Sequence, residues 1–320
     1  MRLNQSSFDQ VRFCIVLATT GGPFLKATLG SICSQLRKND LLVLVDNSEN
    51  QIELDEKTIP SKINYVVLRK PEQEGAAEAY NYGLRYAKDL EVDYIAIASD
   101  DDKWLKGRLE TQFKYLSADS IVFGSAIYSA KVGCLKWSRK RPKRMIRPDQ
   151  SILEYLYGKR LLFLNSRYLP AATIVFPASL ASLEMKSFLI CREDIWWLHE
   201  AQKLGYRLRQ HKEPVVQVLA NFEKDARRSN EKLVLEFAKM LPSNLQLKFL
   251  VYHSVRSRIA SGNLESLRSL QKQIVENFSF ETTLRAEMRA AFLFQRILCR
   301  VVKMAVLMGG FGNDKPKRSN

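Results

Sequence analysis

The sequence predicts an α/β fold built on a parallel sheet, followed by a helical C-terminal region. Two observations favour the sheet. Short runs of apolar residues alternate with helix-like stretches over the first 120 residues, and each run is apolar throughout rather than on alternate positions. A third observation predicts the helical region, because the pattern beyond residue 229 is helical wherever it is periodic.

The first half divides into alternating strands and helices. Thr19-Thr20-Gly21-Gly22-Pro23 breaks the chain after the first apolar run, and Asp46-Asn47-Ser48 is a turn sequence after the second. Apolar and β-branched residues fill the runs, as expected for buried strands. We predict strands at 11–18, 41–45, 63–68 and 94–98, and helices ending near residue 36 and spanning 78–90 and 105–116.

The second half is less regular. We predict a short helix at 152–157, a strand at 172–176, and a helix at 193–204 that stops at Gly205. Pro242-Ser243-Asn244 begins a later helix, and Gly262-Asn263 interrupts the helical region. The expected domains are 1–228 (a donor-binding half at 11–120 and an acceptor half at 121–228), a helical region at 229–312, and a disordered basic tail at 313–320.

Composition indicates a globular protein of the cytoplasm. With 320 residues, of which 46% are apolar, the chain can bury a large core. Its five cysteines are scattered without a CxxC pair, which favours reduced thiols over a disulfide framework. The N-terminal residues lack the apolar core of a signal peptide.

The formal charge of +16 predicts an anionic partner. Its densest cluster runs from Lys136 to Arg147 around Pro142, with Trp137 as its one aromatic residue. No helix-turn-helix, zinc or RNA-binding signature accompanies it, which disfavours a nucleic-acid partner. A solvated loop near an acidic substrate or a lipid surface explains the cluster at least as well.

The last apolar stretch, from Ala290 to Gly312, is interrupted by Arg296, Arg300 and Lys303. Charges at this spacing argue against a membrane-spanning helix and fall on one face of a helix. Two alternatives stay open. The helix lies at an anionic membrane as a peripheral anchor, or its apolar face packs on the protein's own core.

Polar residues follow three of the predicted strands. Thr19, Asp46 and the triplet Asp100-Asp101-Asp102 all stand where a strand ends. Ligands bind at the carboxyl ends of the strands in sheets of this kind, and closely spaced carboxylates predict a bound cation such as Mg²⁺ or Mn²⁺ that carries a diphosphate. The structural alternatives are a solvated acidic turn, or acids that cap a helix beginning near Leu105.

These residues together resemble the family-2 glycosyltransferases of the inverting GT-A fold, a Rossmann-like class of nucleotide-diphospho-sugar transferases. The resemblance covers about two thirds of the chain, from Arg12 to Gln217. Five short motifs carry it, in the family's order: Val16-Leu17-Ala18-Thr19-Thr20, Val43-Leu44-Val45-Asp46-Asn47-Ser48, Gly75 with Asn81-Tyr82-Gly83, Ser99-Asp100-Asp101-Asp102-Lys103-Trp104, and Arg192-Glu193-Asp194-Ile195-Trp196-Trp197.

The resemblance implies a role for each of these sites. Thr19, Asp46, Asn81, Asp100 and Asp101 would contact the donor, with Asp46 at the nucleotide base. The Asp-x-Asp motif would hold the metal through Asp101 and Asp102, although Ser99 replaces the usual first aspartate and an Asp100-x-Asp102 frame stays open. No histidine lies between Lys212 and Tyr252 to complete a three-ligand site.

On the acceptor side, the resemblance makes Asp194 the catalytic base. An inverting transfer needs a base facing the anomeric carbon opposite the leaving group, and a carboxylate can serve. Glu193, Thr173 and Trp197 would support the acceptor, and Arg227 with Arg228 could clamp the diphosphate. Acids in a first helical turn also stabilise a helix without any catalytic role, and aromatic residues at helix ends are commonly core.

The expected activity is therefore metal-assisted transfer of a hexose from a nucleoside-diphosphate sugar, with UDP as the favoured nucleotide. The acceptor would be a saccharide or a lipid-linked sugar in polysaccharide biosynthesis, such as capsule formation. Two alternatives stay open: a nucleotidyltransferase that makes the sugar nucleotide, for which Gly21-Gly22-Pro23 with Lys26 is a poor loop, and a non-catalytic module that binds nucleic acid or anionic lipid. The sequence does not determine the sugar, the acceptor or the oligomeric state.

Overall fold

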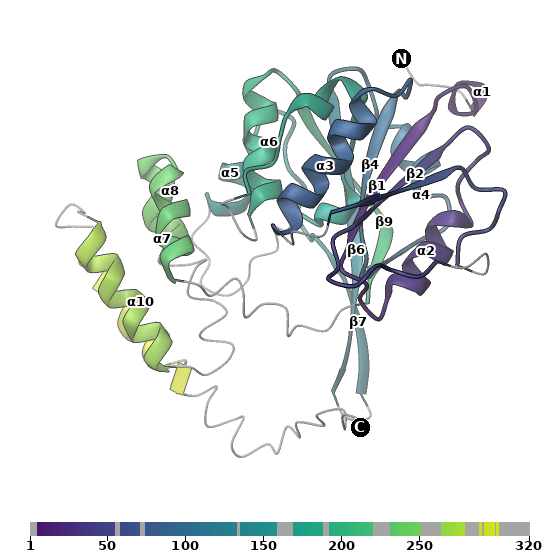
Figure 1. Cartoon of the computed structure of the whole chain (residues 1–320). Coiled ribbons are helices and arrows are strands. Elements are labelled where there is room, and N and C mark those ends of the chain that lie inside the picture. Colours follow the sequence, from purple (N-terminus) through teal and green to yellow (C-terminus); the bar gives the residue numbers. More distant parts are fainter. Residues whose placement is uncertain are drawn as a thin grey trace, which may run out of the picture. The chain divides into compact units, whose positions relative to one another are not determined.

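The structure is a computed structural model of the chain, shown in Figure 1. It describes residues 5–54, 58–70, 74–132, 135–158, 169–187, 192–219, 231–250, 264–278, 288–289, 291–297 and 299–300. The predicted tail at 313–320 and the predicted clamp at Arg227 and Arg228 lie outside these residues.

The chain forms two compact units, and each is described by itself. The first unit comprises Met1–Lys131, Lys136–Leu156 and Asn165–Phe222. The second comprises Val132–Leu135, Tyr157–Leu164 and Glu223–Asn320. Apart from Arg227 and Arg228, the residues that the sequence singled out for chemistry belong to the first unit.

One half of the sheet is parallel, as predicted. Its strands are β1 (Phe13–Thr19), β2 (Leu41–Asp46), β3 (Tyr65–Arg69) and β4 (Tyr94–Ser99), paired in parallel in the order β3-β2-β1-β4. The central strands are buried and apolar on both faces, which is typical of a parallel sheet with helices on both sides. Parallel pairing brings the carboxyl ends of these strands to one edge.

The other half of the sheet is mixed, and most of it was not predicted. Among the described residues the sheet has nine strands; eight lie in the order β3-β2-β1-β4-β8-β6-β9-β5, and β7 pairs with β6. The pairs β4·β8, β6·β8 and β5·β9 are antiparallel. The additional strands are β5 (Asp102–Trp104), β6 (Ser120–Val132), β7 (Leu135–Arg141), β8 (Val175–Pro177) and β9 (Arg207–Val218).

Helices α2 (Leu25–Cys33) and α3 (Ala76–Lys88) cover opposite faces of the parallel half (Figure 1). Leu29 of α2 belongs to the same core cluster as Leu17 and Leu44. α3 instead packs on Val16, the residue before Leu17 on β1. A Cβ added at Gly83 would stand only 2.6 Å from Val16 Cγ1. Because side chains alternate along a strand, Val16 and Leu17 point to opposite faces. The sheet is therefore the middle layer of the first unit.

Three expectations about local structure are wrong. The strand expected at 172–176 begins only at Val175, because Ala171–Thr173 forms a 3-10 helix. The helix expected at 105–116 is shortened to α4 (Arg108–Phe113): the Leu105 N–H still donates to the Val215 carbonyl of β9, and Gly107 has a left-handed backbone with a φ of 74°. Part of the basic cluster expected as a loop is strand β7. The remaining short elements are α1 (Gln5–Phe8), α5 (Ile152–Tyr157), the 3-10 helix Ala178–Ser182, and α6 (Glu193–Lys203).

From Glu231 onward, the described part of the second unit is helical, as predicted. It contains α7 (Glu231–Met240), α8 (Ser243–Lys248) and α10 (Leu264–Asn277), with further helical residues at 288–289, 291–297 and 299–300. Phe237 and Phe249 pack edge to face at 5.1 Å between ring centroids and form part of its core. Among the described residues, no helix has the length and apolar character needed to cross a membrane.

Candidate functional site

The carboxyl ends of β1, β2 and β4 meet at one edge of the sheet. Thr19 lies opposite Asp46 across the β1–β2 pair, and Ala18 lies opposite Ser99 across the β1–β4 pair. The Thr19 hydroxyl donates a hydrogen bond of 2.8 Å to Asp100 Oδ2 and accepts one of 3.0 Å from the Gly21 N–H. Two of the predicted site residues are therefore in direct contact.

Asp46 is fully buried and organises the loop that follows β2. Its Oδ1 accepts from the Ser48 N–H at 3.1 Å, which is the Asx turn that the sequence suggested. Its Oδ2 accepts from the Ile52 N–H at 3.0 Å and from the Arg69 guanidinium at 2.6 Å. Burial alone would raise the pKa of Asp46, but the hydrogen bonds from Ser48, Ile52 and Arg69 outweigh it and hold this pKa below its usual value. Asp46 is thus a charged anchor for the loop.

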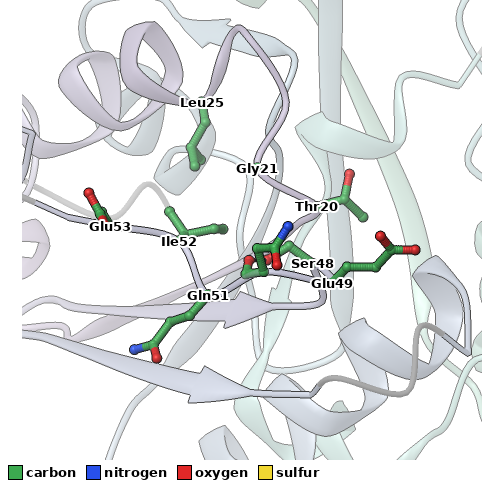
Figure 2. Close-up of a pocket in the computed structure, with 9 residues that line it drawn as sticks. Thr20, Gly21, Leu25, Ser48, Glu49, Gln51, Ile52 and Glu53 are labelled. Carbon is green, nitrogen blue, oxygen red and sulfur yellow. Dashed lines mark hydrogen bonds between the residues drawn. The ribbon is translucent and has the colours of Figure 1, made fainter.

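A pocket of about 480 Å³ lies between this loop and the turn after β1 (Figure 2). Leu25 belongs to the core cluster against which Ile52 packs, so one part of the pocket wall is apolar. The rest offers hydroxyl, carboxylate, amide and backbone groups. The lining residues are Thr20, Gly21, Leu25, Ser48, Glu49, Asn50, Gln51, Ile52 and Glu53.

Gly21 is needed where it stands in the pocket wall. Its φ of +78° is rarely adopted by other residues, and an added Cβ would stand 3.6 Å from Ile52 Cγ1. Gly22 follows in the same turn, and a Cβ added there would stand 3.4 Å from Asp100 Oδ2. The turn after β1 therefore passes close to both the pocket and the acidic triplet.

The acidic triplet is held by its backbone. The Thr28 hydroxyl of α2 donates 3.0 Å to the Asp100 carbonyl, and the Leu219 N–H donates 2.9 Å to the Asp101 carbonyl. Asp102 pairs with Val218 in the β5–β9 ladder and is only 7% exposed. The three carboxylates therefore stand in different surroundings, and Asp102 is the most buried of them. It does not cap a helix, because it begins a strand.

A buried arginine lies behind this triplet. Arg108 is fully buried, its guanidinium lies 3.9 Å from the centre of the Trp104 ring, and its Nη2 donates 3.0 Å to the Ile97 carbonyl. Burial lowers the pKa of Arg108 to about 9, and the negative charge of Asp102 opposes this shift. Arg108 thus supplies positive charge beneath the acidic turn. The sequence did not single out this residue.

Glu193 and Asp194 form the first turn of α6 and are both half-buried. Asp194 Oδ1 accepts from the Ile195 N–H at 2.8 Å. Carboxylates in this position are stabilised by the helix dipole. The roles assigned to both residues stay predictions.

Thr173 and Trp197 lie in the core of the first unit. The Thr173 hydroxyl donates 2.7 Å to the Pro170 carbonyl and accepts from the Gly124 N–H at 3.2 Å, so the alternative of a solvent-facing strand threonine is wrong. Trp197 is 1% exposed, and its indole N–H donates 2.7 Å to the Leu183 carbonyl. Both residues hold backbone in place.

Asn81 and Tyr80 connect α3 to two distant segments. Asn81 is buried, and its side-chain amide pairs with the backbone of Met185. The Tyr80 hydroxyl donates 2.9 Å to the Ala98 carbonyl, two residues before the acidic triplet. Burial raises the pKa of Tyr80, which keeps this phenol protonated. This contact of Tyr80 could not be predicted from the sequence, because a tyrosine in an amphipathic helix usually serves packing alone.

Comparison with known proteins identifies the family. The model of glycosyl transferase family 2 matches residues 14–182. Crystal structures of S. aureus TarS 1–349, alone and in complex with UDP-GlcNAc, are similar in fold: each has a TM-score of 0.50 over 93% of this chain and 92% of TarS 1–349, at 16% and 14% sequence identity. No curated protein sequence matches the chain. The predicted GT-A type of α/β fold is confirmed, and since the family model covers more than half of the chain, the protein belongs to glycosyl transferase family 2.

Proposed function

We propose that the protein transfers a sugar, with inversion, from a UDP-sugar to a saccharide or lipid-linked acceptor in polysaccharide biosynthesis. One observation carries the proposal: the pocket at the strand ends adjoins the Thr19–Asp100 pair, inside the region that matches the family. TarS, a protein of similar fold, has a crystal structure in complex with UDP-GlcNAc. Because the matched family consists of glycosyl transferases, we favour this function over the two alternatives, a nucleotidyltransferase and a non-catalytic module.

The pocket suits the nucleoside of such a donor. An apolar wall formed by Leu25 and Ile52 can pack against a planar base, and the polar groups of residues 48–53 can read its edge. Asp46 anchors this loop from beneath, since both of its carboxylate oxygens already accept hydrogen bonds. Asp46 therefore acts on the base chiefly by shaping the loop.

The acidic turn suits a divalent cation carried by the diphosphate. Within the described parts of the chain, no group of three His, Cys, Asp or Glu side chains could hold a metal alone. Magnesium commonly uses one or two carboxylates together with phosphate oxygens and water, so Asp101 with Asp100 or Asp102 is a sufficient set. A bound Mg²⁺ or Mn²⁺ would neutralise the charge that grows on the leaving diphosphate.

Asp194 is our choice for the base that removes the proton from the acceptor hydroxyl. Its position in the first turn of α6 favours the ionised carboxylate that a base requires. Glu193, on the neighbouring position, would orient the acceptor. The Asp194 carboxylate then takes the proton as the hydroxyl oxygen attacks the anomeric carbon from the side opposite the diphosphate.

A thermal-stability measurement tests the donor site. UDP with Mn²⁺ should raise the melting temperature by several degrees, since a ligand at 100 times its Kd stabilises the folded state by about 2.7 kcal/mol. Chelator should reduce this rise, and Asp101→Asn should remove its metal-dependent part while metal-free UDP still gives its smaller shift. If no nucleoside diphosphate shifts the melting temperature at millimolar concentration, the proposal fails.

We also propose that the second unit holds the enzyme against an anionic membrane. Leu293, Phe294 and Ile297 are 61%, 47% and 52% exposed on a stretch that contains no acidic residue between 288 and 300. Exposed Arg289 and Arg300 flank them. Exposed apolar side chains beside cations match the surface of an interfacial helix. The proposed location is the cytoplasmic face of the plasma membrane.

A further inference from the structure

The side chain of Asn81 makes a two-point contact with a segment 104 residues away. Its Nδ2 donates 2.8 Å to the Met185 carbonyl, and its Oδ1 accepts 2.7 Å from the Met185 N–H. The side chain is buried, at 2% exposure. In the opposite amide orientation, the side-chain NH₂ would face the Met185 N–H and the side-chain oxygen would face the Met185 carbonyl. These contacts therefore fix the orientation of the amide.

The segment held by Asn81 is also bound to the helix that carries Asp194. Trp197 of α6 donates its indole N–H to the Leu183 carbonyl at 2.7 Å, two residues before Met185. Trp197 is buried and packs on Phe176 of β8 at 4.8 Å between ring centroids. Trp197 lies one helical turn after Asp194. A set of contacts therefore runs from buried Asn81 through residues 183–185 to buried Trp197 of α6.

The same helix, α3, is fixed to the donor side. Gly83 lets it approach β1 and β2 closely, and the neighbouring Tyr80 donates its hydroxyl proton to the Ala98 carbonyl at 2.9 Å. Ala98 lies on β4, immediately before the turn that contains the acidic triplet. α3 thus contacts both the strand that leads into the acidic turn and the segment that leads into α6.

We propose that Asn81 is a positioning residue that holds residues 183–185, and through Trp197 the Asp194 carboxylate, at a fixed distance from the donor. The inference rests on the proposed function, because it assigns the base to Asp194. It gives Asn81 a different role from the donor contact that the sequence suggested. Transfer depends steeply on this distance, since a displacement of about 1 Å can lower a rate on the order of 100-fold.

Other contacts between α3 and this segment are weaker candidates for the same role. Arg85 pairs with Glu184 at 2.7 Å, but the two side chains are 45% and 54% exposed. Exposed ion pairs of this kind contribute little to stability. Arg85 therefore provides a matched control, because it contacts the adjacent residue of the same segment from the same helix.

The test compares Asn81→Asp with Arg85→Met. Asn81→Asp keeps the acceptor for the Met185 N–H but sets a carboxylate oxygen against the Met185 carbonyl. We expect its Kd for UDP to stay within about twofold of wild type while kcat for UDP release from UDP-GlcNAc falls on the order of 100-fold. Arg85→Met should change kcat by less than about threefold. Ala87→Gly, a buried change six residues farther along α3 than Asn81, controls for lost stability.

Two results would overturn the inference. In one, Asn81→Asp weakens UDP binding by the same factor as it lowers turnover, which would make Asn81 a donor contact. In the other, kcat falls by the same amount per degree of lost melting temperature in Asn81→Asp and in Ala87→Gly. That result would leave Asn81 with only a structural role.

Hydrogen exchange separates this inference from the proposed function. Asn81→Ala should speed amide exchange at Met185, whose N–H loses its acceptor, by at least tenfold while α3 and β4 stay protected. Unchanged exchange at Met185 contradicts the contact itself. If wild type neither binds UDP nor releases it from UDP-GlcNAc, the proposed function and the catalytic role of this contact both fall, whatever the exchange shows.

Discussion

At the scale of single residues, the site contains carboxylates whose surroundings differ. Asp46 is saturated with hydrogen bonds, Asp100 holds the Thr19 hydroxyl, and Asp194 stands half-buried at a helix start. Because both carboxylate oxygens of Asp46 already accept hydrogen bonds from the protein, Asp46 is suited to shaping the loop. Proton transfer by Asp194 stays a proposal.

Replacing Asp194 with Asn tests the base. Transfer should fall by roughly 10²–10⁴-fold, because a neutral amide cannot take the acceptor proton, while the UDP-dependent rise in melting temperature persists. Initial rates of UDP release report the change. Glu200→Gln, which removes an acid farther along α6, should leave the rate near wild type. A near-normal rate in Asp194→Asn would exclude Asp194 as the base.

His211 predicts a pH dependence of stability. It is 2% exposed and stacks on Tyr115, with the rings 12° from parallel. Burial lowers the pKa of His211; the nearby Glu213 opposes this shift, and Arg108 and Lys140 add to it. The folded state therefore binds a proton less readily than the unfolded state. The free energy of unfolding should be at its full value above the ordinary histidine pKa of about 6.5. It should decline as the pH falls from there toward the lowered pKa of His211, by at most about 1.4 kcal/mol per pH unit.

Urea unfolding between pH 5 and 7.5 measures this dependence. His211→Gln should be less stable at neutral pH and should show a flatter profile below pH 6.5. An equally steep profile in the variant would assign the dependence to another group.

The residues that meet at the sheet edge were partly predictable. Thr19, Asp46 and Asp100 end three strands, so their convergence follows from parallel pairing alone. Arg108 and Asn81 could not be assigned their contacts from sequence. Their partners, the Ile97 carbonyl and the Met185 backbone, are main-chain groups that carry no sequence signal.

At the scale of secondary-structure elements, the fit of α3 on the sheet depends on one missing side chain. A Cβ at Gly83 would lie 2.6 Å from Val16 Cγ1 and 2.9 Å from Val45 Cγ2. Contacts this short force either the helix or the valines to move. The separation between α3 and the sheet is therefore set by a glycine.

Gly83→Ala should destabilise the protein by about 1–3 kcal/mol, although alanine favours helices. Gly30→Ala on α2 is the matched control, because nothing lies within 4 Å of its added Cβ. That variant should gain roughly 0.5–1 kcal/mol. Urea unfolding of both proteins measures the difference, and a stabilised Gly83→Ala would show that the sheet side of α3 has spare room.

Elements with a local sequence signal could be predicted, and those that depend on pairing with distant segments could not. The parallel strands and α5 were predicted closely, because buried apolar runs and helical periodicity are local signals. β9 was not, since Arg207–Val218 mixes cations, a proline and apolar residues, and pairs with β6 and β5 from distant parts of the chain. Tertiary pairing decided its structure.

At the scale of the whole molecule, the charge of +16 and the exposed apolar residues of the second unit predict membrane binding. Leu293→Glu should weaken co-sedimentation with anionic vesicles about tenfold, since it removes apolar burial and adds repulsion. Leu204→Glu is the matched control, because Leu204 is 63% exposed and Leu293 is 61% exposed.

The dependence of vesicle binding on ionic strength adds a second measurement to this test. Raising ionic strength from 0.1 M to 1 M shortens the Debye length from about 10 Å to 3 Å, so binding to anionic vesicles should weaken. Neutral vesicles should bind the protein poorly. Equal loss in both leucine variants, or no binding to any vesicle, would reject the membrane surface. Self-association that Leu293→Glu abolishes would instead identify a second copy of the chain as the partner.

The strand order also has a consequence for synthesis of the chain. The pocket at the strand ends is formed by segments completed by residue 53, and the parallel strands around it by residue 99. β4, however, receives its other neighbour only when residues 175–177 have been made, and the acidic turn is enclosed by β9 later still. During that interval β4 presents a bare hydrogen-bonding edge, the kind of surface through which nascent chains aggregate. We therefore expect the chain to be most prone to aggregation through β4 while it is being translated.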